Sequence, residues 1–206
     1  MTITIIDYGM GNLASIQNML KSLGIPSLIS SDPKAISRAE KLILPGVGSF
    51  DQGVEKIQSK SFLVESIQET VVERIRPILG ICLGMQLLME SSEEGDLPGL
   101  SLVPGTVKKF KKDSSIGKIH MGWNSIKILN AENPIFKYLE SELRFYFVHG
   151  YFVIPENEIH TIAQTNFGID FSSAINSNKI WGMQFHPEKS HKFGQAILKG
   201  FGEMEC

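Results

Sequence analysis

The stretch Pro77-Ile78-Leu79-Gly80-Ile81-Cys82-Leu83-Gly84-Met85-Gln86 decides the fold. Its apolar run, which ends at a cysteine flanked by glycines, predicts a strand, a tight turn and a helix. The spacing Gly-x-Cys-x-Gly is the thiol counterpart of the Gly-x-Ser-x-Gly turn, in which glycines relieve crowding around a strained central residue. The positive end of the next helix favours a thiolate, so Cys82 is a candidate nucleophile. The alternative is a buried cysteine that packs as a small hydrophobic residue.

Outward from this turn, the first half of the chain alternates short apolar runs with longer amphipathic ones. This pattern predicts βαβ units and a parallel sheet. We expect strands at 2–7, 27–30, 41–44 and 77–81, and helices at 11–23, from 33 onward, 50–60, 62–74 and 83–90. Asp32 is the expected N-cap of the second helix, with Pro33 at its first position.

After about residue 100 the segments become short and β-rich. We expect strands at 107–110, 125–128, 143–154, 161–164, 172–175 and 179–184, and a closing helix at 189–201. They suit an antiparallel or mixed extension of the sheet. The predicted fold is one α/β domain over residues 1–206, with an open, mostly parallel central sheet, flanking helices and a β-rich second half.

Composition narrows the class of protein. Of 206 residues, 42% are hydrophobic and 20% charged, which permits a packed core, and the net charge of −2 gives no footprint for a nucleic acid. No apolar run approaches the roughly 20 residues that cross a bilayer, and the N-terminus does not resemble a signal peptide, so we expect a cytoplasmic protein. Cys82 and Cys206 suggest neither a disulfide framework nor a metal site; we expect no metal and no cofactor, and no role for Cys206.

A thiol nucleophile needs a nearby histidine. Among five histidines, His186 follows the apolar run 180–185, at the C-terminal end of a predicted strand, where sites form in open α/β sheets. Pro187 holds it extended, and Glu188, two residues on, can lie beside it and orient the imidazole. The alternative is an ordinary polar turn before a helix. His149 is the second candidate base, although its β context favours a structural role.

Two motifs, 80–86 and Gln184-Phe185-His186-Pro187-Glu188, together resemble the class I (triad) glutamine amidotransferases, whose fold is flavodoxin-like. The resemblance is strongest to the glutaminase subunits of imidazole glycerol phosphate synthase, the HisH family of histidine biosynthesis. Segments similar to that family occur in family order over nearly the whole chain: 7–12, 45–50, 120–124, 146–151 and 186–190.

The resemblance implies a reaction in which Cys82 attacks the side-chain amide of glutamine. His186 moves protons, Glu188 orients it, and a thioester is hydrolysed to glutamate. Backbone donors must stabilise the developing oxyanion. The candidates are the N–H of Leu83 and the loop Gly46-Val47-Gly48, whose two glycines would allow a peptide to flip. The alternative for this loop is an ordinary turn at a strand end.

The resemblance also implies that a glutamine pocket is lined by Gln86, Glu94, His149, Gly150 and Tyr151. The Glu94 carboxylate could hold the α-ammonium of glutamine; a solvated surface charge is the alternative. Gly150 departs from the family, which usually has Ser or Thr there, so a hydroxyl contact is lost although a backbone contact could persist.

A (β/α)₈-barrel cyclase subunit, HisF-like, is the partner that the resemblance implies, in a heterodimer through which ammonia passes. The matching docking residues are Asn12, Met121, Trp123, Tyr146 and Lys189. Large side chains with a polar handle suit an interface, although Tyr146 could equally pack in the core and Lys189 could be a free surface lysine.

Three other functions stay open. Relatives of these subunits aminate sugar nucleotides for surface polysaccharides, and residues 189–194 are similar to that branch. A catalytically idle scaffold is disfavoured by the intact Cys82, His186 and Glu188. A stand-alone cysteine hydrolase is disfavoured by the sequence after the nucleophile and by the interface motifs.

Overall fold

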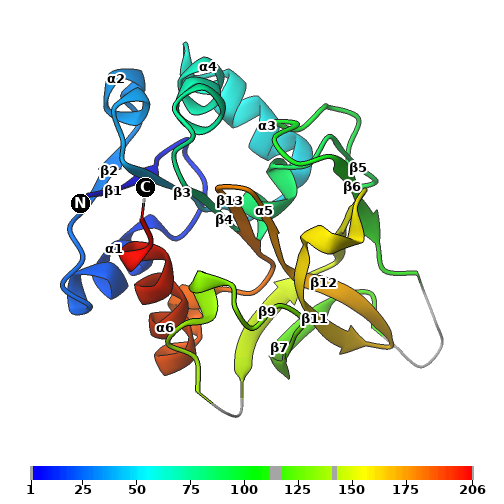
Figure 1. Cartoon of the computed structure of the whole chain (residues 1–206). Coiled ribbons are helices and arrows are strands. Elements are labelled where there is room, and N and C mark those ends of the chain that lie inside the picture. Colours follow the sequence, from blue (N-terminus) through cyan, green and yellow to red (C-terminus); the bar gives the residue numbers. More distant parts are fainter. Residues whose placement is uncertain (1, 112–116, 141–142, 206) are drawn as a thin grey trace.

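The computed structural model describes residues 2–111, 117–140 and 143–205 (Figure 1). Five parallel strands form the centre of the molecule in the order β2-β1-β3-β4-β13. Their bounds are Ser27–Ser30 (β2), Ile3–Ile6 (β1), Lys41–Leu44 (β3), Ile78–Ile81 (β4) and Ile180–Met183 (β13). Every residue of β1, β3, β4 and β13 is buried, as expected for a parallel sheet covered on both faces.

Helices cover both faces of this sheet because successive side chains of each strand point to opposite sides. Ile5, Ile43 and Leu79 pack on one side with α1 (Leu13–Ser22) and α6 (His191–Glu203). Ile6 and Leu42 pack on the other side. There the cover consists of α2 (Pro33–Ser37), α3 (Phe50–Gln58), α4 (Leu63–Gln68) and α5 (Leu83–Leu87). The predicted α/β layering is therefore confirmed.

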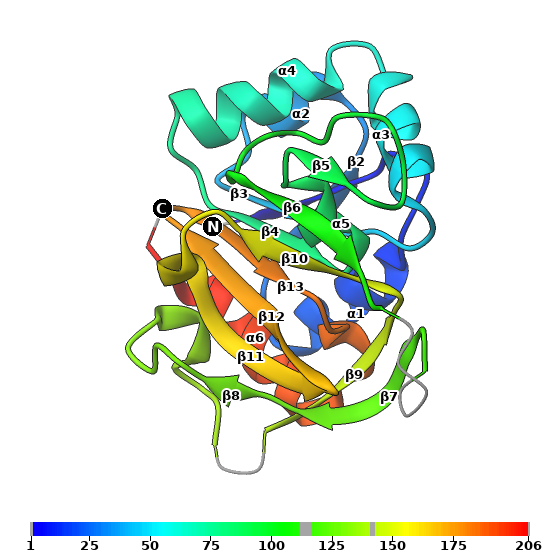
Figure 2. The ribbon, with the colours of Figure 1, turned by 90° about the vertical axis from the view of Figure 1, so that its right-hand side faces the viewer.

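The second half extends the sheet with antiparallel strands beyond β13, as Figure 2 shows. These are β12 (Ile169–Ser177), β10 (Tyr151–Pro155), β6 (Gly105–Lys109), the short parallel β5 (Ser91–Ser92), and β11 (Thr161–Phe167) with β8 (Lys127–Ile128). A separate antiparallel pair, β7 (His120–Ser125) and β9 (Arg144–His149), lies beside β11. Short 3₁₀ turns occupy η2 (Pro134–Phe136), η3 (Glu158–His160) and η4 (Pro187–Lys189).

Several predicted boundaries are correct and others are wrong. The strands 27–30 and 41–44 and the Asp32 cap, which accepts from the Lys34 N–H, are confirmed. The single strand predicted at 143–154 is two strands in different sheets, because Gly150 breaks the run. The strand predicted at 125–128 is the end of β7 plus the short β8, so most of β7 was missed.

Two predicted helices are shorter than expected for local reasons. Helix 62–74 changes at Glu69 to a π-helix, η1 (Glu69–Glu73), where Thr70 Oγ1 donates to the carbonyl oxygens of Ser66 and Ile36. The helix expected to reach residue 90 ends at Leu87, because N–H groups of the following loop bond to the Leu87 and Leu88 carbonyl oxygens.

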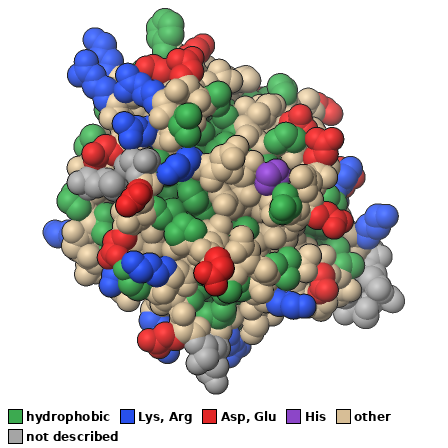
Figure 3. Space-filling view, viewed as in Figure 1, with side chains coloured by type: hydrophobic (Ala, Val, Ile, Leu, Met, Phe, Trp, Pro, Cys, Tyr) green, Lys and Arg blue, Asp and Glu red, His purple; other side chains and the backbone are tan. Residues whose placement is uncertain are grey.

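Surface features agree with the composition. Acidic and basic side chains are interspersed over the face that Figure 3 shows. In the described part of the chain, no helix combines the length and apolar character needed to cross a membrane.

Candidate active site

Cys82 occupies the strained turn between β4 and α5. Its backbone has φ 54° and ψ −110°, a conformation that residues with a Cβ rarely adopt. Its N–H donates to the Met183 carbonyl oxygen at 2.7 Å, which ties the turn to the adjacent strand β13. A Cβ on Gly84 would stand 1.8 Å from the Leu44 carbonyl oxygen, and one on Gly80 would stand 2.7 Å from the Gly84 carbonyl oxygen. The turn is therefore possible only with both glycines.

His186 reaches the same edge from β13. Parallel pairing sets Met183 at the end of β13 opposite Ile81 at the end of β4, so the segments that follow these two strands leave the sheet side by side. The His186 N–H donates to the Tyr146 carbonyl oxygen at 2.9 Å, and its Nδ1 lies 2.8 Å from Glu188 Oε1. Both side chains are almost wholly buried, at 1% and 2% exposed. The predicted pairing of His186 with Glu188 is present in the structure.

The second ring nitrogen of His186 is the informative one. Nε2 is buried and has no hydrogen-bond partner in the part of the chain that the structure describes. Burial opposes the charged imidazolium, but interactions with Cys82 and Glu188 outweigh it and raise the pKa of His186 to about 9. His186 is therefore a proton donor and acceptor that lies between the Cys82 thiol and the Glu188 carboxylate.

A cavity of about 200 Å³ opens beside these groups. It is lined by Val47, Gly48, Cys82, Leu83, Gln86, Glu94, Val148, His149, Gly150, Tyr151 and His186. The structure thus brings together residues from widely separated segments of the chain. Of the predicted catalytic, oxyanion and pocket residues, only Gly46 and Glu188 lie behind the cavity wall instead of lining it.

The loop after β3 forms one wall of the cavity. Gly46 is a close-packing position, because a Cβ there would stand 2.7 Å from the Tyr8 hydroxyl and 2.8 Å from the Gly84 nitrogen. Tyr8 donates to the Pro45 carbonyl oxygen at 2.7 Å and so holds the base of the loop. Gly48 has φ +114°, which an L-residue rarely adopts, while Val47 is exposed. The loop is anchored at its base and free of a Cβ at its tip.

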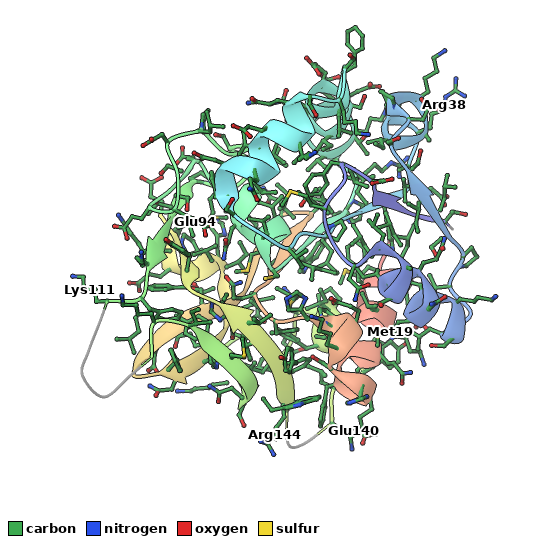
Figure 4. All side chains as sticks on the ribbon, turned by 180° about the vertical axis from the view of Figure 1, so that it is seen from behind. Met19, Arg38, Glu94, Lys111, Glu140 and Arg144 are labelled. Carbon is green, nitrogen blue, oxygen red and sulfur yellow. The ribbon has the colours of Figure 1, made fainter. Side chains whose placement is uncertain are left out.

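Glu94, which is labelled in Figure 4, bonds to the N-terminal end of α3 and lines the same cavity as Cys82. Its Oε2 accepts from the Phe50 N–H at 2.9 Å, so one carboxylate oxygen is committed to the protein. Partial burial raises the pKa of Glu94, and the Phe50 N–H opposes that shift. The alternative of a fully solvated surface charge does not describe this residue.

Gln184 is a site residue that the sequence analysis missed. It is fully buried, its Nε2 lies 3.8 Å from the Cys82 sulfur, and its Oε1 accepts from Gln86 Nε2 at 3.2 Å. A partial signal was available, because Gln184 ends the predicted strand 179–184 and stands two residues before His186.

His149 has both ring nitrogens bonded within the fold. Its Nδ1 lies 2.7 Å from the Tyr151 carbonyl oxygen and its Nε2 lies 3.0 Å from His120 Nδ1. Burial lowers the pKa of His149 to about 3. A ring with both nitrogens engaged is a poor general base, although it lines the cavity.

Four of the five predicted docking residues are near one another. Trp123 and Tyr146 stand on the paired strands β7 and β9 with ring centroids 6.2 Å apart, and Lys189 Nζ lies 5.7 Å from the Tyr146 ring centroid. Met121 is 66% exposed on the same face of β7 as Trp123. Tyr146 is half-buried, so the alternative of a core position does not describe it. Asn12 begins α1, which packs against η4, the turn that carries Lys189.

Two predictions of absence concern metals and the second thiol. Within residues 2–111, 117–140 and 143–205, no cluster of three or more His, Cys, Asp or Glu side chains could hold a metal ion. Cys206 lies outside the described residues, so its expected lack of a role is not tested.

Comparison with known proteins agrees with this geometry. Residues 4–203 match the family described as glutamine amidotransferase class-I. The chain is 46% identical over 199 residues to imidazole glycerol phosphate synthase subunit HisH 2 of Methanococcus maripaludis, covering 97% of this chain and 98% of that one. It is 42% identical to subunit HisH of Bdellovibrio bacteriovorus, covering 98% and 100%. A solved structure of a GMP synthase subunit from Thermoplasma acidophilum has the same fold, with a TM-score of 0.73 at 22% identity over 98% of this chain and 92% of that one.

The fold and the family match define a class I glutamine amidotransferase. More particularly, the chain belongs to the HisH family of imidazole glycerol phosphate synthase subunits.

Proposed function

We propose that this chain is the glutaminase subunit of an imidazole glycerol phosphate synthase, with Cys82, His186 and Glu188 as its catalytic triad. One observation carries the proposal. A strained cysteine and a buried histidine, whose Nδ1 is paired with a carboxylate and whose Nε2 has no hydrogen-bond partner among the described residues, border one cavity. The family membership supplies glutamine as the substrate.

The first half-reaction is acyl transfer. The Cys82 thiolate attacks the side-chain carbonyl carbon of glutamine, a C–S bond forms and negative charge develops on the carbonyl oxygen. The N–H of Leu83, directly after the nucleophile, and an N–H of the Gly46-Val47-Gly48 loop would receive that charge. Because Gly48 lacks a Cβ, the loop can turn a peptide toward the oxyanion at low conformational cost.

His186 then acts as the acid. Its Nε2 proton goes to the amide nitrogen as the C–N bond breaks, so ammonia leaves and a γ-glutamyl thioester remains. A water attacks the thioester while His186 accepts its proton, the C–S bond breaks and glutamate departs. Glu188 holds Nδ1–H throughout, which keeps Nε2 aimed at the sulfur and stabilises the imidazolium.

Substrate binding follows from the cavity lining. The Glu94 Oε1, which has no hydrogen-bond partner among the residues that the structure describes, is suited to the α-ammonium of glutamine, because Oε2 already accepts from Phe50. The backbone of His149, Gly150 and Tyr151 faces the same cavity and offers contacts to the polar ends of glutamine, while Gln86 supports the Tyr151 carbonyl oxygen at 3.2 Å.

The partner in this proposal is a HisF-like (β/α)₈-barrel cyclase, with the two chains forming a heterodimer in the cytoplasm and the chain acting as one 1–206 domain. The docking surface consists of Asn12, Met121, Trp123, Tyr146 and Lys189. It suits an interface because exposed aromatic and thioether side chains stand beside a cation and close to His186. Ammonia would pass directly to the cyclase, without a cofactor on this subunit.

Replacing the nucleophile tests the proposal. In the reconstituted heterodimer, we expect Cys82→Ala to lower glutamine-dependent synthesis by about 10⁴-fold or more, as for removal of other nucleophiles that act within a triad. Synthesis from added ammonia should stay unchanged. Loss of both activities would show that Cys82 has a structural role and would contradict the proposal.

The ammonia acceptor needs a separate test. The stretch 189–194 that resembles the sugar-nucleotide branch lies against the docking surface, where the His191 ring stacks on Trp123 with centroids 5.5 Å apart. The assay is therefore run with each cognate cyclase-like partner and its own acceptor. We expect turnover with the histidine-pathway acceptor; turnover only with a sugar nucleotide would assign the chain to the other branch, as would sugar-nucleotide enzymes in the neighbouring genes.

A further inference from the structure

A continuous chain of hydrogen bonds runs from strand β7 to the Cys82 sulfur. Asn124 Nδ2 lies 3.0 Å from His120 Nε2, and His120 Nδ1 lies 3.0 Å from His149 Nε2. His149 Nδ1 lies 2.7 Å from the Tyr151 carbonyl oxygen. Gln86 Nε2 donates to the same Tyr151 carbonyl oxygen and to Gln184 Oε1, each at 3.2 Å. Gln184 Nε2 in turn lies 3.8 Å from the Cys82 sulfur.

The direction of both bonds that the His120 ring makes is fixed by Asn124. Asn124 Oδ1 accepts from the Ser125 N–H at 2.8 Å, and Asn124 Nδ2 also donates to the Asn166 carbonyl oxygen at 2.9 Å, so the amide has one orientation. Nδ2 must therefore donate to His120 Nε2. A neutral His120 then carries its proton on Nδ1 and donates to His149 Nε2, and His149 donates from Nδ1 to Tyr151. Each ring has a single tautomer.

The surroundings keep both rings neutral and in place. The His120 ring stacks between Phe147 and Phe167, with centroids 4.5 Å from each. Burial lowers the pKa of His120 to about 4 and that of His149 to about 3. Neither ring takes up a proton near neutral pH, so the polarity of the chain is maintained there.

Strand β7 links this chain to the proposed docking surface. Because its side chains alternate, His120, Gly122 and Asn124 face inward while Met121 and Trp123 are exposed. A displacement of β7 by a bound partner would move Asn124 and His120 together. Further along the same chain of hydrogen bonds, the Tyr151 carbonyl oxygen accepts from both His149 and Gln86 in the cavity wall.

We propose that His120 and His149 are positioning residues, which hold the Tyr151 backbone, Gln86 and Gln184 in register with Cys82 and transmit the position of β7 to that nucleophile. The proposal rests on the proposed glutaminase function and deepens it. Neither ring touches the reacting atoms; their effect passes through the pocket wall.

Two substitutions at His120 separate this role from simple packing. His120→Phe keeps the ring between Phe147 and Phe167 but removes both hydrogen bonds. His120→Asn loses the ring but keeps an N–H donor where Nδ1 stands. His160→Phe is the control, because its Nδ1 contacts the Asn176 carbonyl oxygen at 3.1 Å away from the cavity. Each variant is assayed in the full heterodimer for kcat and KM with glutamine, and for turnover with ammonia.

We expect His120→Phe to lower the glutamine kcat about tenfold, a cost of roughly 1.4 kcal/mol in the activation barrier, with ammonia-dependent turnover unchanged. His120→Asn should recover most of that loss, and His160→Phe should match the parent. In imidazole ¹⁵N spectra of the parent, His149 should be protonated on Nδ1 alone. A kcat for His120→Phe equal to or above that of His120→Asn would show a packing role and overturn the proposal. Failure of the parent heterodimer to consume glutamine would instead overturn the proposed function.

Discussion

Two buried nitrogen groups, Lys41 and His186, stand in opposite parts of the sheet and are bonded in opposite ways. Lys41 Nζ, fully buried at the start of β3, donates to the carbonyl oxygens of Phe201, Gly202 and Met204 at 2.8, 2.8 and 2.6 Å. His186 is as deeply buried, but only its Nδ1 has a partner, and Nε2 has none in the described chain.

The difference separates a structural group from a reactive one. An ammonium has three N–H donors, and Lys41 uses all three on the end of α6, where the last carbonyl groups of a helix lack partners. The Lys41 ammonium is therefore saturated with hydrogen-bond acceptors, and its role is to stabilise the fold. His186 keeps one nitrogen available at the cavity edge, which costs stability but, in the proposed mechanism, allows it to exchange a proton with Cys82.

The largest effect is expected from replacing the reactive pair by apolar residues, with His186→Leu and Glu188→Leu made together. Glutamine-dependent kcat/KM should fall about 10⁴-fold, roughly 5.5 kcal/mol, because the proton carrier is lost. The free energy of unfolding should stay within about 2 kcal/mol or rise, since apolar residues often replace a buried ion pair without loss. Steady-state kinetics and urea unfolding measure the two quantities.

The single variant His186→Leu serves as the control for this swap. It leaves the Glu188 carboxylate buried and unpaired, so it should lower the free energy of unfolding more than the double variant does. Equal activity in the double variant and the parent would contradict the assigned role of His186.

Lys41→Met should produce the reverse pattern. It removes the donor from three carbonyl oxygens, and we expect the free energy of unfolding to fall by about 3–5 kcal/mol. The glutamine kcat per folded molecule should stay within about twofold, because Lys41 has no contact with the cavity. Urea unfolding with the assay at low temperature measures both.

Lys179→Met is the matched control for Lys41→Met. Lys179 Nζ also bonds to a C-terminal carbonyl oxygen, that of Glu205 at 3.2 Å, but it does so in an exposed position. We expect a change within about 0.5 kcal/mol. A similar loss in both lysine variants would show that burial and saturation of Lys41 are not what stabilises this end of the molecule.

His186 and Lys41 also differ in how far the sequence alone could predict their roles. The Cys82 turn, His186 and Glu188 were predictable because they are adjacent to strand ends, where the backbone itself sets their direction. Lys41 reads as an ordinary strand residue, since its acceptors lie 160 or more positions away. The break at Gly150, which sends β9 and β10 into different sheets, and the chain through His120 likewise depend on long-range pairing that no local pattern encodes.

The pH dependence of stability should sharpen the comparison between the two groups. The pKa of His186 is raised to about 9, so its contribution is complete below about pH 6.5 and is lost as the pH rises through 9. Between pH 6.5 and 9.5 the parent should lose up to about 3 kcal/mol, at 1.4 kcal/mol per pKa unit.

Urea unfolding at pH 6.5 and 9.5 measures this loss, and the double variant at His186 and Glu188 is the control that should lose less. The window excludes lower pH, because the lowered pKa values of His120 and His149 reduce stability as the pH falls below 6.5. An identical pH slope in the parent and the double variant would remove His186 as its source.

The smallest effect is expected at Gly150, in the cavity wall. A Cβ there would stand 3.4 Å from the Lys118 carbonyl oxygen and 3.9 Å from Ile119 Cγ1, which is ordinary contact. Gly150→Ser should therefore fold normally, and its hydroxyl should change the KM for glutamine by no more than about threefold, under 1 kcal/mol. A loss of tenfold or more in kcat/KM would show that the cavity wall has no room for a side chain at residue 150, just as the surroundings of Lys41 are fully packed. A reactive site that leaves Nε2 of His186 available also needs room beside it for the substrate, and Gly150 tests whether that room exists.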